Sequence, residues 1–162
     1  MKTCSIIGHR NIEITEELAN KTRKIIIDLI QKGVSNFLFG SKSEFNSLCY
    51  EIITEIKIDF PQIKRVFVRA EYPYVSNEYI NYLLEFYEDS FYFDKEGNSS
   101  KFNYIKRNEY LINNSDVCLF YFDIDYKPKN RTSSGTAISY NYALNKKKEI
   151  INVAPQKNDL EN

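Results

Sequence analysis

A chain of 162 residues, 43% hydrophobic and 15% aromatic, is long enough to bury a core and too apolar to be disordered, so we expect a folded globular protein. Its 22 lysines and arginines balance 22 aspartates and glutamates, and this lack of a basic excess argues against nucleic acid as a partner. The N-terminal apolar run is too short for a signal sequence and no run approaches a membrane span. We therefore expect a cytoplasmic protein with no membrane partner.

The three cysteines, Cys4, Cys49 and Cys118, all lie inside apolar segments. Their number is odd and they lack the paired spacing of a metal site. We expect them to be reduced core residues, and we expect neither a bound metal nor a cofactor.

Buried strands alternate with amphipathic helices in the first part of the chain. An apolar run at residues 4–7 precedes a helix that begins near Thr15, has acidic residues in its first turn and ends at Gly33. A second strand at residues 36–39 precedes the helix with the clearest apolar stripe, residues 45–56, and a third strand follows at residues 64–70. Two successive strand–helix–strand units require parallel pairs with right-handed crossovers, so the predicted class is α/β.

The second part of the chain is less regular. The pattern predicts a helix over residues 77–87, a short strand at 90–93 and a helix that begins about residue 102 and ends near residues 113–114. The continuous apolar run at residues 117–122 is typical of a central strand buried on both faces. A polar segment at residues 123–132 is predicted to be a mobile loop that would suit a lid.

The last predicted elements are a helix over residues 136–147, with Ala137, Tyr140 and Leu144 on one face, and a strand at residues 149–153. No internal repeat or linker is visible. We therefore predict one domain over residues 1–154 and a polar tail at residues 155–162.

The strongest candidate site is the turn formed by Ser134, Gly135 and Thr136, between the central strand and the last helix. Backbone N–H groups and hydroxyls at the positive end of a helix dipole suit a phosphate. The alternative interpretation of this turn is a plain helix cap. A nucleotide-like anion is the ligand that we expect there.

Loops that leave the other strands are also polar or contain glycine, and ligands of open parallel sheets bind beyond the carboxyl ends of the strands. These loops supply Gly8, His9 and Arg10 after the first strand and Gly40, Ser41 and Ser43 after the second. A guanidinium suits phosphate, whereas His9 either contacts the ligand or packs locally, and Ser43 either contacts the ligand or caps the next helix. The GxxxxGK[ST] and GxGxxG patterns are absent, so neither a P-loop enzyme nor a standard dinucleotide fold is indicated.

Glu44 and Glu71 are the candidate catalytic carboxylates, since each follows a predicted strand. Glu44 either contacts a ribose or a reacting group, or is a favourable charge in the first turn of a helix. Arg107 and Asn108 lie in the helix before the central strand, where composition alone favours a solvent-exposed arginine.

Five segments, taken in order, resemble one superfamily. They are Ser5-Ile6-Ile7-Gly8-His9-Arg10, Phe37-Leu38-Phe39-Gly40-Ser41, Tyr104–Ile112, Ser115-Asp116-Val117, and Ser134-Gly135-Thr136-Ala137 with Tyr142-Ala143. This ordered set, spanning residues 3–153, resembles the SLOG superfamily of lonely guy phosphoribohydrolases, Smf/DprA DNA-processing proteins and ADP-ribose-type sensor domains. The nearest branch looks like the stand-alone DUF1273/YpsA-like proteins.

The resemblance implies a Rossmann-like three-layer sandwich with a mostly parallel central sheet that binds a nucleotide or a nucleotide-derived ligand. Arg107 matches the arginine of the family. The phosphoribohydrolases carry a PGGxGTxxE pattern, whose glutamate steadies a developing ribosyl cation. Ser139 stands at that position here and cannot supply the charge, which favours a binding protein or sensor unless Glu44 or Glu71 replaces it.

Three functions remain in competition on the sequence. The first is binding of an ADP-ribose-, NAD- or nucleoside-monophosphate-like molecule by a sensor or regulator. The second is an enzyme, a phosphoribohydrolase or deoxyribosyltransferase that cleaves N-glycosidic bonds of nucleotides. The third is a protein-interaction module, because thirteen tyrosines suit a subunit interface and predict a homodimer or a higher homo-oligomer.

Overall fold

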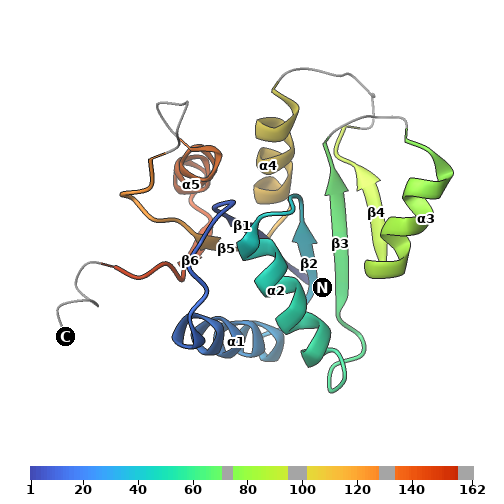
Figure 1. Cartoon of the computed structure of the whole chain (residues 1–162), viewed down its shortest axis with the longest axis horizontal. Coiled ribbons are helices and arrows are strands. Elements are labelled where there is room, and N and C mark those ends of the chain that lie inside the picture. Colours follow the sequence, from blue (N-terminus) through green and yellow to red (C-terminus); the bar gives the residue numbers. More distant parts are fainter. Residues whose placement is uncertain (71–74, 95–101, 128–133, 157–162) are drawn as a thin grey trace.

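Five helices and one six-stranded sheet make up the described part of the computed structural model, which comprises residues 1–70, 75–94, 102–127 and 134–156 (Figure 1). The strands are β1 (Lys2–Gly8), β2 (Val34–Phe39), β3 (Lys64–Arg69), β4 (Asp89–Tyr92), β5 (Val117–Tyr121) and β6 (Glu149–Asn152). The helices are α1 (Glu16–Gln31), α2 (Glu44–Ile56), α3 (Asn77–Phe86), α4 (Asn103–Asn113) and α5 (Gly135–Asn145). The predicted elements of the α/β class are therefore present, and their ends shift by a few residues.

The sheet is entirely parallel, with strand order β4-β3-β2-β1-β5-β6. The chain steps outward from β1 to β4 and then crosses back so that β5 pairs with the free side of β1. Ser5 in β1 is level with Leu38 in β2 and with Cys118 in β5. The order of the strands therefore reverses between β1 and β5, and a crevice forms at such a switch point in open α/β sheets.

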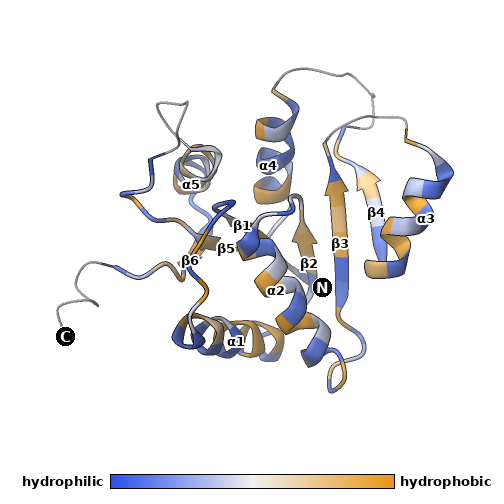
Figure 2. Ribbon diagram, viewed as in Figure 1, coloured by the Kyte–Doolittle hydropathy of each residue, from blue (hydrophilic) through white to orange (hydrophobic). Residues whose placement is uncertain are grey.

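Helices cover both faces of the sheet and give three layers. One core packs α1, α2 and α3 on the face that carries Cys4, Phe37 and Phe67. The other packs α4 and α5 on the face that carries Leu38 and Phe120. Figure 2 shows hydrophobic residues along the strands and on the inner sides of the helices. This arrangement is the Rossmann-like sandwich that the resemblance implies.

The inner face of α5 differs from the prediction. Thr136, Ser139 and Ala143 are buried, and Ser139 contacts Asn108 of α4, whereas Leu144 is 51% exposed. Apolar residues occur all around this helix, so the larger ones do not mark its buried side. Three small residues, spaced three and four apart, allow α5 to lie close to the sheet.

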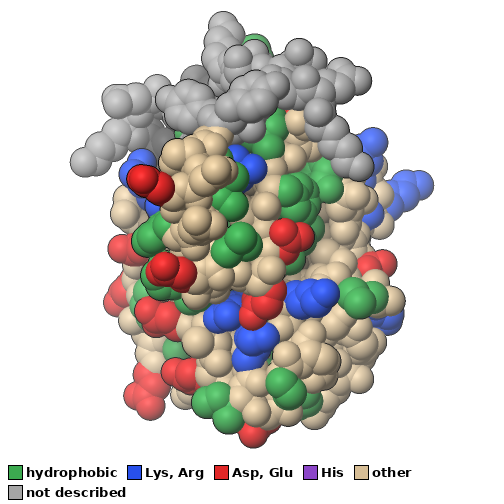
Figure 3. All heavy atoms as spheres, turned by 90° about the vertical axis from the view of Figure 1, so that its right-hand side faces the viewer, with side chains coloured by type: hydrophobic (Ala, Val, Ile, Leu, Met, Phe, Trp, Pro, Cys, Tyr) green, Lys and Arg blue, Asp and Glu red, His purple; other side chains and the backbone are tan. Residues whose placement is uncertain are grey.

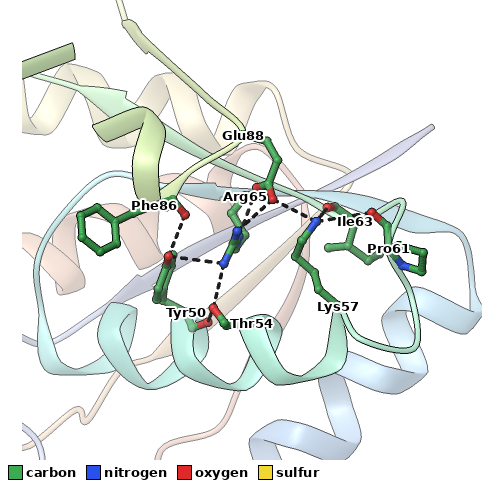
Figure 4. A network of polar contacts seen from close by, with 8 residues as sticks. All are labelled: Tyr50, Thr54, Lys57, Pro61, Ile63, Arg65, Phe86 and Glu88. Carbon is green, nitrogen blue, oxygen red and sulfur yellow. Dashed lines mark hydrogen bonds and ion pairs between the residues drawn. The ribbon is translucent and has the colours of Figure 1, made fainter. Parts of the chain in front are cut away.

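A network of polar side chains joins α2 to β3 and to the segment between α3 and β4 (Figure 4). The Arg65 guanidinium donates to both carboxylate oxygens of Glu88, at 3.1 and 2.9 Å, and to Thr54 Oγ1 at 2.8 Å. Lys57 Nζ lies 2.9 Å from Glu88 Oε1. Burial raises the pKa of Glu88, but its hydrogen bonds with Arg65 and Lys57 outweigh burial and lower the pKa to about 2. The network therefore links α2 to the edge of the sheet that β3 and β4 form.

The three cysteine thiols are free and buried, which confirms their placement in the core. Within the described ranges, no helix is long and apolar enough to cross a membrane. Figure 3 shows the side of the molecule on which α3 and β4 lie. Acidic, basic and hydrophobic side chains are mixed on this surface.

Candidate functional site

A cavity of about 610 Å³ opens at the carboxyl ends of β1 and β2 and extends to the start of α5. Its described lining consists of Ile6, Ile7, Gly8, His9, Arg10, Gly40, Ser41, Lys42, Ser43, Phe67, Tyr104, Arg107, Asn108, Leu111, Tyr126, Ser134, Gly135 and Thr136. All eleven of the predicted ligand-binding residues are in this set. Loops that are far apart in the sequence therefore meet at the switch point of the sheet.

The exit of β1 brings a glycine, a histidine and an arginine to the cavity. Gly8 packs against α2 so closely that a Cβ atom there would lie 2.5 Å from Phe45 Cβ. His9 is 3% exposed, whereas Arg10 is exposed at the surface of the cavity. Between Gly8 and Arg10 the chain therefore passes from the packed core to the exposed surface of the cavity.

His9 is held by the segment that follows β5. Its Nε2 accepts a hydrogen bond of 3.0 Å from the Asp123 N–H, and its ring stacks on Tyr126 with centroids 4.1 Å apart. Burial lowers the pKa of His9 below its usual value of 6.5, although contacts with Asp123 oppose this shift. Asp123 and Tyr126 thus contact His9 directly, the mobility of this segment stays a prediction, and residues 128–132 of the predicted lid lie outside the described residues.

Arg107 enters the cavity from α4 and is only 3% exposed, so the solvent-exposed arginine favoured by composition is wrong. Its side chain packs on Gly40, where a Cβ would lie 2.6 Å from Arg107 Cδ. Its Nε donates to Asn108 Oδ1 at 3.0 Å, and its guanidinium carbon lies 5.6 Å from the centre of the Tyr104 ring. The glycine after β2 therefore makes room for a buried cation.

Asn108 links this arginine to the start of α5. Its Nδ2 donates to Ser139 Oγ at 3.1 Å, and Ser139 Oγ donates to the Gly135 carbonyl at 3.0 Å. Sequence reasoning treated Ser139 only as a missing carboxylate, and its actual contacts hold α4 and α5 together.

Two helix N-termini face the cavity. Ser134 caps α5 by accepting the Ala137 N–H at 3.0 Å, and Ser43 caps α2 by accepting the Asn46 N–H at 3.1 Å. The capping alternatives for both serines are thus correct, and both still line the cavity. Among the described residues, apart from its chain neighbours and its own helix, no atom lies within 4 Å of the position that a Cβ of Gly135 would take, which leaves open space at the N-terminus of α5.

The two candidate carboxylates are not in the described lining. Glu44 is exposed, and its Oε2 accepts the Ile12 N–H at 2.6 Å, so it fixes the loop after β1. Glu71 lies outside the described residues. None of the described lining residues is an aspartate or a glutamate.

Sequence reasoning missed Lys42, Tyr104 and Tyr126 as lining residues. Two of them had a local signal: Lys42 lies between two predicted serines, and Tyr104 precedes Arg107 by three residues, which places both on one side of a helix. Tyr126 had none, because its position depends on stacking against the ring of His9, which is distant in the sequence.

No protein-family model matches the chain, and no curated protein matches it. Two solved structures match in fold. DNA processing protein A (DprA) from Streptococcus pneumoniae aligns with a TM-score of 0.59 at 12% identity, over 92% of this chain and 49% of that one. DprA from Helicobacter pylori, described in a single-stranded DNA binding mode, aligns with a TM-score of 0.59 at 19% identity, over 96% and 66%.

The chain has a DprA-like fold. At 12% and 19% identity this likeness concerns the fold, so the superfamily that the sequence segments resemble and its DUF1273/YpsA-like branch both stay predictions. The chain spans about half of the S. pneumoniae protein and about two thirds of the H. pylori protein.

The DprA likeness corrects the expectation that nucleic acid is not a partner. That expectation rested on a net charge of zero over the whole chain, yet H. pylori DprA, of similar fold, binds single-stranded DNA. The physical reason is local, because Arg10, Lys42 and Arg107 gather at one cavity whose described lining has no acidic residue. Net charge is an average that does not describe the field inside a cleft.

Proposed function

We propose that the chain binds a nucleotide or a nucleotide-derived molecule through its phosphate, in the cavity at the carboxyl edge of the sheet. The observation that carries this proposal is the charge of the cavity. Three cations, Arg10, Lys42 and Arg107, line it together with the N-termini of α2 and α5, and no carboxylate is among its described lining residues. Such a site favours an anion, and the two helix dipoles add to the same preference.

Arg107 is the residue that we assign to the phosphate itself. Its guanidinium is buried and oriented by Asn108, so few rotamers remain to be lost when a ligand binds. A guanidinium also presents several donors in a plane that matches phosphate oxygens. Arg10 and Lys42 are exposed and supply charge to the same cavity from the segments after β1 and β2.

Single-stranded DNA is a second candidate ligand. The fold likeness to H. pylori DprA favours it, and a strand offers the same phosphate chemistry as a free nucleotide. N-glycosidic cleavage is less well supported, because it needs a carboxylate beside the ribose and Glu44 is engaged with the Ile12 N–H.

Titration of the purified protein tests this proposal. The ligands are nucleoside monophosphates, NAD, ADP-ribose and a labelled oligothymidylate, followed by calorimetry or fluorescence anisotropy. We expect binding by at least one of them, and a loss of about 1.5–3 kcal/mol in Arg10→Ala, which removes a charged hydrogen bond from an exposed residue. Arg10→Lys should recover only part of that loss, because an ammonium lacks the planar donor pair.

The matched control is Arg23→Ala, which removes a cation from α1 outside the described lining of the cavity. Free base released from a monophosphate, detected by chromatography, would instead support the enzyme. If no ligand binds, or if both alanine variants weaken binding equally, the proposal is wrong.

A further inference from the structure

Tyr104 differs from every other aromatic ring in the described lining of the cavity. It lies in the first turn of α4 and is 56% exposed, whereas Phe67 is 1% exposed and His9 3%. Tyr126 is partly buried, and one face of its ring is covered by His9. More than half of the Tyr104 side chain is therefore accessible to a ligand at the rim of the cavity.

The geometry around Tyr104 suits a nucleobase. One side of its ring carries the Arg107 guanidinium, 5.6 Å from the ring centroid. The phosphate that we assign to Arg107 would therefore sit close to this ring. In a nucleotide the base and the phosphate are attached to one sugar, so a ligand held by Arg107 inside the cavity can place its base at the rim.

We infer that Tyr104 is a stacking platform for the base of the bound nucleotide, an inference that rests on the proposed phosphate site. Stacking reads the flat face common to all bases rather than their hydrogen-bonding edges. The site therefore accepts different bases, and its ligand class is a nucleotide recognised by phosphate and base face together. A free nucleotide and one unit of a single strand share this chemistry.

Removal of the ring tests the inference. Tyr104→Ala should weaken binding of oligothymidylate by about tenfold, the effect of losing one stacked base. An abasic strand of equal length has the same sugars and phosphates but no bases, so its affinity should be the same for the wild type and Tyr104→Ala. Tyr82→Ala is the matched control, because Tyr82 is 50% exposed on α3 and does not line the cavity.

A fluorescent variant gives a direct readout of stacking. The chain contains no tryptophan, so Tyr104→Trp adds a single indole at the rim. Its emission should be quenched by the base-bearing strand and not by the abasic strand, while the emission of Tyr82→Trp should stay unchanged with both. Thymidine 5′-monophosphate is the second base-bearing ligand. Quenching by it at similar concentrations identifies a free nucleotide as the source, and quenching by the strand alone identifies a single strand.

Two results would overturn the inference. One is an equal loss of affinity for base-bearing and abasic strands in Tyr104→Ala, and the other is unchanged affinity for both. Failure of the underlying phosphate site has a different signature, because the wild type would then bind neither kind of strand and no monophosphate.

Discussion

Gly40 and Gly135 both line the cavity, but only Gly40 is closely surrounded by other atoms. Substitutions at the two positions therefore distinguish a glycine needed for packing from one needed for ligand contact. At Gly40 a Cβ would lie 2.6 Å from Arg107 Cδ and 2.7 Å from its Nε, so Gly40→Ala must push the guanidinium from its place. At Gly135 no described atom outside its own helix and chain neighbours lies within 4 Å of the Cβ position, so the first atom of a side chain has open space there.

We expect Gly135→Val to weaken ligand binding by more than tenfold, about 1.4 kcal/mol, with little change in melting temperature, because a side chain there occupies space next to the bound phosphate. Gly40→Ala should weaken binding and also lower the melting temperature, since a buried side chain moves. Calorimetry and thermal denaturation measure the two effects. A large drop in melting temperature for Gly135→Val would show that this glycine serves the cap rather than the ligand.

His9 makes stability depend on pH near neutrality, and it is the only histidine in the chain. Burial lowers the pKa of His9 in the folded protein, and this effect outweighs the contacts with Asp123, which raise the pKa. The unfolded chain therefore binds the proton more readily than the folded protein does. The free energy of unfolding should therefore fall as the pH drops from about 7 to 5, as the Asp123 N–H loses its acceptor. Urea denaturation across this range should show a flatter pH dependence in His9→Gln, whose amide oxygen still accepts but does not titrate. Equal slopes in both proteins would contradict this prediction.

The elements themselves were largely predictable, and the reason is periodicity. The stripe along α2 and the continuous apolar run of β5 each identify an element from local sequence alone. The inner face of α5 was not predictable, since its buried residues are Thr136, Ser139 and Ala143. Small and polar residues carry no periodic apolar signal.

The candidate site also has a part that could be predicted from local sequence and a part that could not. Loops after strands revealed Gly8, Arg10 and Gly40, because the parallel topology sends all such loops to one edge. The burial of Arg107 was not visible in its own segment, since it depends on a glycine 67 residues earlier in the chain and on Asn108. Contacts across such separations follow from the fold and not from local pattern.

The link between α2, β3 and β4 predicts a second pH effect, at lower pH. Because the pKa of Glu88 is lowered to about 2, its ion pairs stabilise the fold above the unfolded value near 4.5, and this contribution disappears as the pH falls from about 4.5 to 2. Glu88→Gln should lower the free energy of unfolding at neutral pH by about 1–2 kcal/mol, a range that allows for partial exposure. It should also lose part of the acid dependence.

Urea denaturation at neutral and acid pH measures both effects, and Glu55→Gln is the control. Glu55 pairs with Arg23 at a surface where its side chain is 64% exposed, so its removal should change stability little. Equal losses in the two variants would mean that the network around Arg65 adds nothing beyond a surface ion pair.

Over the whole molecule, basic and acidic residues are equal in number, but they are not evenly distributed. The cavity gathers cations while other surfaces mix both signs, as beside α3 and β4 (Figure 3). Binding of a single strand should therefore weaken with salt despite the neutral chain. In a plot of log affinity against log salt, Lys42→Ala should reduce the slope by about 0.7, the value for one phosphate contact, and Lys24→Ala on α1 should leave it unchanged. A slope of zero in the wild type would contradict a phosphate site.

The central position of β1 also governs the order in which the molecule assembles. Thr3 and Asp116 are joined by hydrogen bonds of 2.8 Å although they are 113 residues apart in the chain. As the polypeptide leaves the ribosome, β1 to β4 can pair early, but the other side of β1 stays bare until β5 emerges. Such distant pairing is slow, and a bare strand edge invites association between chains. A nascent chain that ends between β4 and β5 therefore carries four of the six strands, an unpaired edge on β1 and no cavity wall from α5, so ligand capture begins only after α5 has been synthesised.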